Sequence, residues 1–263
     1  MTEKPLILAI ETSGRLGSVA IAAGPQLMAE TEFSAPIRHS AEIFPAICGL
    51  LERFAKRPGE IDHIYISGGP GSFTGLRIAV TIAKIMSLAN SVKIVSVGTL
   101  DAIAANANDY IEEKHTKVEK IGTILDAKRG QFFVAAYENQ MGQWKKILPD
   151  CLMTAPKYLE RIAGSTEPIW LLGEGLVYYK DKFNADGIRF LDEKYWVPKA
   201  AKIHLLGWQM ALAGHFAEPL MLVPAYLRRP EPEEKLEMGG IGLGPTTSCV
   251  SVDIYIDGFC ICR

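Results

Sequence analysis

Two acidic residues occupy matching places in the sequence, each at the end of an apolar stretch and just before a short turn. In ILAIETSGRLGSVAIAA, Glu11 precedes Thr12 and Ser13, and in GTILDAKRGQFFVAAY, Asp126 precedes a turn of similar length. An acid at a strand end can hold a metal ion, and the hydroxyl and amide groups of a small-residue turn can hold phosphate. The pattern fits either a phosphate-binding turn built from Glu11, Thr12, Ser13 and Asp126 or a plain hairpin, and the residues alone favour the hairpin slightly.

A glycine-rich loop, SGGPGSFTG, follows the apolar run 61–66 and precedes a helical segment. Such a loop at a helix N-terminus is a common anion site, because free N–H groups point outward there. The P-loop pattern fails because Gly75 precedes Leu76 instead of a lysine, and the dinucleotide pattern fails because Thr74 stands where its last glycine belongs. We therefore predict a tight strand-to-helix turn without a ligand. Its shape-determining residues are Gly68, Gly69, Pro70, Gly71 and Gly75.

The composition argues against several classes of protein. The 263 residues carry a formal net charge of −2 and the pI is about 6.2, unlike the basic balance of a nucleic-acid-binding domain. No apolar run reaches the ~18 residues of a membrane span, and we predict no signal peptide. The five scattered cysteines are typical of reduced thiols in the cytoplasm. His39 is followed four residues later by Ile43, so no histidine pair for a metal is predicted there.

Two helices are predicted in the first part of the chain, over 40–56 and 75–90. The first is amphipathic. The second is apolar around most of its circumference, and its polar residues form one narrow stripe made of Arg77, Thr81, Lys84 and Ser87. A helix with so wide an apolar surface is covered on more than one side, by its own sheet and by a second domain or a partner protein.

The chain also contains two related halves. The scheme of strand, acid, turn and strand returns after roughly 115 residues, and the charged stretch 109–119 separates the halves. A long helix is expected at 200–216, and 230–235 has the composition of a linker. The final residues alternate in polarity around Asp257-Gly258, which predicts a hairpin.

Five motifs together resemble the TsaB family, also called YeaZ. They are ILAIETS, HSAEIFP, GGPGSFTGLR, LDAKRGQFF and PAYLRRPE, in this order, over roughly residues 5–232. The resemblance implies an α/β fold of the actin-like ATPase (ASKHA) type, with two ribonuclease-H-like lobes whose mixed sheets are flanked by helices. The implied parts are a first lobe at 1–108, a reduced second lobe at 109–232 with the 200–216 helix packing back on the first, and an atypical tail at 233–263.

The resemblance also implies a function. It points to a cytoplasmic, non-catalytic scaffold subunit of the complex that makes N6-threonylcarbamoyladenosine at position 37 of tRNA. The implied partners are the TsaD transferase, in a heterodimer, and the TsaE ATPase through the complex, with tRNA contacted indirectly and no membrane contact. In isolation the chain is either a monomer or a homodimer. No cofactor is required, ATP or ADP is a candidate ligand at the complex interface, and Glu11, Thr12, Ser13 and Asp126 are read as a vestigial nucleotide site.

In TsaB-like proteins the two helices of the first lobe pack against equivalent helices of TsaD or of a second TsaB. Exposed apolar area of this kind normally marks an interface. The predicted contact residues are Ile43, Phe44, Ile47, Leu76, Arg77, Val80 and Met86. Arg77 and the glycine loop are also hypothesised to meet a nucleotide or the TsaD–TsaE junction. The alternative from another class is a free-standing ATPase or kinase of the same fold, or a metallopeptidase-like enzyme.

Overall fold

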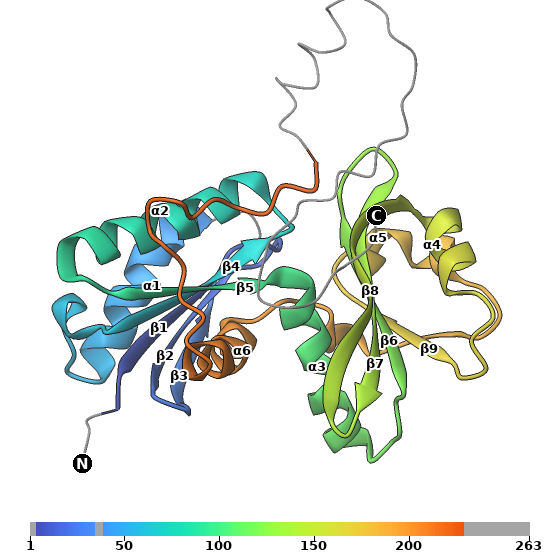
Figure 1. Ribbon diagram of the computed structural model, residues 1–263, viewed down its shortest axis with the longest axis horizontal. Helices are drawn as coiled ribbons and strands as arrows, with labels where there is room; N and C mark the ends of the chain where they lie inside the picture. Colours follow the sequence, from blue (N-terminus) through green and yellow to red (C-terminus); the bar gives the residue numbers. More distant parts are fainter. Residues whose placement is uncertain (1–3, 35–38, 229–263) are drawn as a thin grey trace, which may run out of the picture. The chain divides into compact units, whose positions relative to one another are not determined.

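Two five-stranded mixed sheets organise the chain in a computed structural model that describes residues 4–34 and 39–228 (Figure 1). The predicted tail at 233–263, with its hairpin, lies outside the described residues. The first sheet has the order β3-β2-β1-β4-β5 and the second has the order β10-β9-β6-β7-β8. Each sheet begins with three antiparallel strands and continues with two parallel ones, so the two lobes share one topology and confirm the predicted fold class.

The first sheet is buried on both faces. Its strands are β1 (Leu6–Glu11), β2 (Ser18–Ala23), β3 (Gln26–Glu32), β4 (His63–Gly69) and β5 (Lys93–Gly98). Side chains alternate between the faces of a strand, so Leu8 and Ile10 pack under α1 (His39–Arg53) and α2 (Phe73–Asn90), whereas Ile7 and Ala9 pack under α6 (Ala200–Leu212). This three-layer arrangement explains why β1 reads as an uninterrupted apolar run.

The second sheet carries smaller helices. Its strands are β6 (Lys120–Asp126), β7 (Gln131–Gln140), β8 (Gln143–Thr154), β9 (Ile169–Leu172) and β10 (Ile188–Phe190). The helices of this half are α4 (Ala155–Ile162) and the four-residue α5 (Leu176–Tyr179). Short 3-10 turns complete the chain at η1 (Pro58–Glu60), η2 (Lys180–Phe183) and η3 (Glu193–Tyr195). In the second lobe, the short α5 and η2 follow β9, whereas in the first lobe the long α2 follows β4. The second lobe is therefore the smaller of the two repeats.

The two halves exchange their last helices. The helix α3 (Thr99–Lys114) follows β5, but its Leu100, Ile103 and Ala107 lie in the core of the second lobe. In return, Ala200 and Ile203 of α6 lie in a core cluster of the first sheet, and Figure 1 shows α6 beside that sheet. The helix α3 therefore crosses the boundary predicted at residue 108, and the chain up to Leu227 forms one compact unit.

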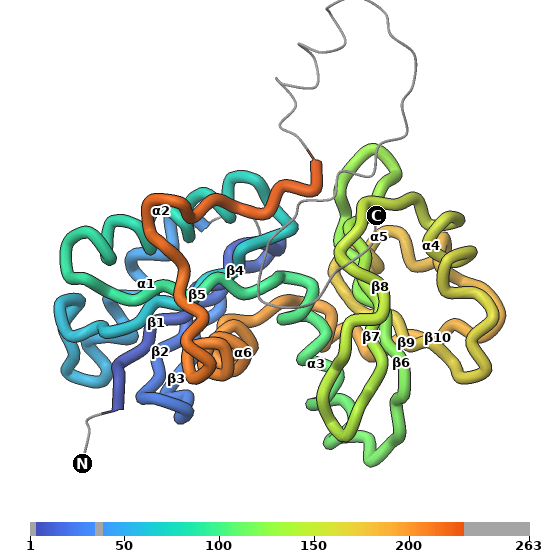
Figure 2. The backbone as a smooth tube through the Cα atoms, viewed as in Figure 1, coloured from blue at the N-terminus to red at the C-terminus, as the bar shows by residue number. Residues whose placement is uncertain are grey.

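The segment after α6, residues 213–228, returns to the first lobe. Ala217 donates a backbone hydrogen bond to Ile94 and Ala225 donates one to Gly68. Lys84 of α2 donates to the carbonyl of Leu220 over 3.4 Å, and Figure 2 shows this orange segment running along α2. The polar stripe predicted on α2 therefore lies beside the chain's own returning segment. Among the residues that the structure describes, no helix is both long and apolar enough to cross a membrane.

Candidate functional site

Glu11 lies at the end of β1 with its carboxylate fully buried. One carboxylate oxygen, Oε1, accepts hydrogen bonds from the amide and the hydroxyl of Ser13, each over 2.5 Å. The other oxygen, Oε2, is buried without a hydrogen-bond partner in the described chain. Burial raises the pKa of Glu11 from 4.5 to about 7, against the opposing effect of the Ser13 hydrogen bonds. The predicted acid is thus present, but it faces protein atoms instead of solvent.

The glycine loop packs directly on the turn that follows Glu11. The hydroxyl of Thr12 donates to the carbonyl of Gly75 over 2.8 Å, and the amide of Ser72 donates to the carbonyl of Ser13 over 2.7 Å. A Cβ atom on Gly75 would lie 1.8 Å from the carbonyl oxygen of Thr12, so only glycine fits. The loop was predicted to be a tight strand-to-helix turn, and it serves here to bring α2 against β1.

The start of α2 is capped within the chain. Ser72 is the N-cap residue and its hydroxyl accepts a hydrogen bond from the amide of Gly75 over 3.3 Å. The helix begins at Phe73, two residues before the predicted start, and β4 continues through Gly69. The amide of Gly75, which could otherwise bind a phosphate, is therefore hydrogen-bonded to Ser72 of the same chain.

A residue of the second lobe completes this site. Glu174, between β9 and α5, is buried and accepts a hydrogen bond from the amide of Arg15 over 2.8 Å. The guanidinium of Arg15 lies over the ring of Tyr178, 4.8 Å from its centroid, and also donates to its hydroxyl. Burial raises the pKa of Glu174, and its negative charge contributes to the raised pKa of Glu11. This contact was not predicted from the sequence.

Asp126, the second predicted acid, is folded into its own turn. Its carboxylate accepts hydrogen bonds from the amide and the ammonium group of Lys128, each over 2.8 Å. Lys128 and Arg129 both have positive φ, which closes the turn tightly. Asp126 is therefore neutralised locally by a neighbouring lysine.

His39 is a packed core residue. Its Nε2 lies 3.1 Å from the carbonyl of Gly14, its ring packs near Phe33, and burial lowers its pKa. Ile43, in the position where a second histidine would be needed, is fully buried. Within residues 4–34 and 39–228, no three side chains of His, Cys, Asp or Glu come together in a way that could hold a metal ion.

The structure corrects several predicted contact residues. Four of them are buried in this chain, so the prediction that they face a partner is wrong: Ile43, Ile47 and Val80 lie in the core under α1 and α2, and Leu76 is buried at the start of α2. The physical reason is that these residues form the side of each helix that covers the chain's own sheet. Met86 is partly buried against the same core. Arg77 is exposed, with its guanidinium 3.7 Å from the centroid of Phe73 and hydrogen-bonded to the hydroxyl of Tyr226.

The outward side of the two helices is nevertheless apolar. On α1, Phe44 is 59% exposed, and Pro45 and Cys48 are exposed beside it at helical spacing. On α2, Ile85 is 59% and Leu88 is 71% exposed. We call these five residues the outer α1–α2 surface. Large apolar side chains exposed on the outward side of helices are typical of a protein–protein contact.

Comparison with known proteins identifies the family of this chain. Residues 34–190 match the sequence model of the family described as TsaD, tRNA N6-adenosine threonylcarbamoyltransferase. The chain is 29% identical to tRNA threonylcarbamoyladenosine biosynthesis protein TsaB of Bacillus subtilis, covering 87% of this chain and 96% of the relative. It is 25% identical to the Escherichia coli protein of the same name, covering 84% and 94%.

The solved structures agree on the fold. YeaZ from Pseudomonas aeruginosa superposes with a TM-score of 0.71 at 22% identity, covering 85% of this chain and all of that one. The two-lobed actin-like fold thus defines the class of the protein. Within that class, the chain belongs to the TsaD family, and its relatives place it in the TsaB (YeaZ) group, as the five sequence motifs predicted.

Proposed function

We propose that this chain is a non-catalytic subunit of the assembly that forms N6-threonylcarbamoyladenosine in tRNA, and that it binds a TsaD-type transferase through the outer α1–α2 surface. The observation that carries this proposal is the exposure of Phe44, Ile85 and Leu88 above a core that is already complete. The biochemical setting comes from relatives that are named for this biosynthesis.

The state of the Glu11 turn supports a role without catalysis. Thr12 and Ser13, which would bind phosphate in an active enzyme, are bonded to Gly75 and Ser72 instead. Glu174 approaches the same turn from the second lobe and adds a second buried carboxylate. A phosphate group would have to break these hydrogen bonds and would meet like charge, which costs several kcal/mol. We infer that the chain alone does not turn over a nucleotide.

The remaining parts of the proposal are based on the same resemblance to TsaB proteins. We propose that a TsaE-type ATPase joins through the complex, that tRNA is contacted indirectly, and that any ATP or ADP binds at the complex interface. We also propose a cytoplasmic location, because the proposed reaction modifies tRNA and the described part of the chain exposes the free thiol of Cys48. In the absence of the transferase, a second copy of the chain is the natural occupant of the outer α1–α2 surface.

A reconstitution experiment tests the proposal. The chain and its cognate TsaD-type subunit are purified separately and mixed, and complex formation, threonylcarbamoyl transfer to tRNA and ATP hydrolysis are measured for each alone and for the mixture. We expect a stable complex, transfer that requires both chains, and no hydrolysis by this chain alone. ATP hydrolysis by the isolated chain that is lost in Glu11→Gln would instead identify a free-standing enzyme of the same fold.

A further inference from the structure

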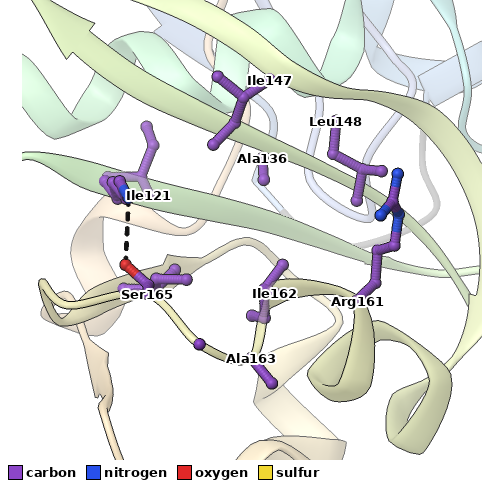
Figure 3. Close-up of a pocket in the computed structure, with 11 residues that line it drawn as sticks. Ile121, Ala136, Ile147, Leu148, Arg161, Ile162, Ala163 and Ser165 are labelled. Carbon is purple, nitrogen blue, oxygen red and sulfur yellow. Dashed lines mark hydrogen bonds between the residues drawn. The ribbon is translucent and has the colours of Figure 1, made fainter.

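A cavity in the second lobe is separate from the Glu11 turn and from the outer α1–α2 surface. It has a volume of about 300 Å3 and opens where α4 ends above the second sheet (Figure 3). Its apolar lining comes from Ile121 on β6, Ala136 on β7, Leu148 on β8 and Ile162 at the end of α4. This volume is at the lower end of the range of small-molecule sites, about 300–1,000 Å3.

Two cations lie at the opening of this cavity. Lys120 donates a hydrogen bond to the hydroxyl of Ser165 over 3.2 Å, and its ammonium lies 3.9 Å from a carboxylate oxygen of Glu138. Arg161 extends from α4 on the other side of the opening in Figure 3. Arg161 forms no hydrogen bond or ion pair with the residues that the structure describes. Its guanidinium is thus the group available to a ligand.

The charges around the opening of the cavity favour a ligand with a single negative charge. Lys120 and Arg161 contribute two positive charges, and Glu138 removes one of them. The C-terminal end of α4 adds roughly half a negative charge, because its last carbonyl groups point toward the loop 162–165. The remaining positive charge is less than one unit, which matches one carboxylate better than a doubly charged phosphate group. A guanidinium also binds a carboxylate through two parallel hydrogen bonds.

We propose that this cavity binds a small carboxylate with an apolar body, such as an aromatic or branched aliphatic acid. The carboxylate pairs with Arg161 at the opening, and the apolar body lies against Ile147 and Ile162, which are the accessible apolar side chains of the lining. Lys120, held by Ser165, fixes the opposite side of the opening and supplies a second donor. The site requires no change in the fold, because its apolar side is formed by the paired strands β6, β7 and β8 and by the end of α4.

Binding of 2-naphthoate to the full-length chain tests the proposal, with its neutral analogue 2-naphthamide as the ligand control. Isothermal titration calorimetry gives both affinities, and amide chemical shifts in NMR spectra locate the site. We expect the acid to bind about tenfold or more tightly than the amide, which is the effect of one charge-assisted pair of hydrogen bonds. The largest shifts are expected at Ile121, Leu148 and Ser165.

Two variants of the same helix distinguish this site from general charge attraction. Arg161→Gln removes the proposed partner of the carboxylate, whereas Lys157→Gln removes an equal charge one turn earlier on α4, at an exposed residue that does not line the cavity. We expect Arg161→Gln to weaken naphthoate binding by about tenfold or more and Lys157→Gln to leave it unchanged. Equal losses in both variants, equal affinity for acid and amide, or absence of binding at millimolar concentration would each overturn the proposal.

Discussion

Replacing Leu88 by aspartate tests the proposed contact surface most directly. Leu88 lies near the end of α2 and is 71% exposed, so most of its side chain is available to a partner. Burying a whole leucine side chain contributes about 1.5–3 kcal/mol, so the exposed part of Leu88 contributes about 1–2 kcal/mol when a partner covers it. An aspartate at the same place loses this contribution and adds the cost of removing a charge from water.

The loss of contact alone corresponds to about a tenfold weaker complex, since 1.4 kcal/mol changes an equilibrium constant tenfold. We therefore expect Leu88→Asp to raise the Kd for the TsaD-type subunit by at least about tenfold, measured by isothermal titration calorimetry on purified chains. The thermal unfolding midpoint of the isolated chain should stay close to the wild-type value, because the substituted side chain makes little contact with the core.

Leu212→Asp is the matched control. Leu212 ends α6 on the other side of the first sheet and is 70% exposed, so it offers the same chemistry in a different place. We expect its Kd to equal that of the wild type. If Leu88→Asp binds the transferase within about threefold of the wild type, or if both variants weaken binding equally, the outer α1–α2 surface is not the contact.

Two further predictions concern the Glu11 turn. The folded-state pKa of Glu11 is raised from 4.5 to about 7, so its contribution to stability is present at low pH and is lost as the pH rises toward 7. Between pH 5 and pH 8, urea unfolding should show the wild type losing about 2–3 kcal/mol more than Glu11→Gln, and parallel pH profiles would contradict the assigned burial. Gly75→Ala places a Cβ atom 1.8 Å from the oxygen of Thr12 and should destabilise the chain by at least about 3 kcal/mol in the same assay. Gly49→Ala, in open space on α1, should be neutral or stabilising by up to about 1 kcal/mol; similar effects of the two alanines would show that the close approach is absent.

Local features of the chain were predictable from the sequence. The first strand, Leu6–Glu11, is predictable because an apolar run that ends in an acid is a local signal. The turn at Gly75 was predictable for the same reason, since the glycines that shape it are neighbours in the sequence. The repeat of this scheme around Asp126 predicted two related lobes, and the two five-stranded sheets confirm them.

Long-range relations were not predictable in this way. Ile43 and Phe44 are adjacent and both apolar, yet one is fully buried and the other is 59% exposed. The choice depends on where the sheet lies, and periodicity does not decide it because Phe44 widens the apolar face of this amphipathic helix. The contact of Glu174 with Arg15 joins residues 159 positions apart, so the local sequence around either residue does not predict it. The same holds for Lys84, whose partner is the returning segment at Leu220.

The exchange of α3 and α6 makes each lobe dependent on the other half of the chain. Without α6, the first sheet would expose the face that carries Ile7 and Ala9, and without α3 the second would lose Leu100 and Ile103 from its core. Neither half therefore holds all the apolar surface that it needs to fold alone. The two lobes should melt in a single cooperative transition, and fragments cut in the short connection after Lys114 should become ordered only when both are present.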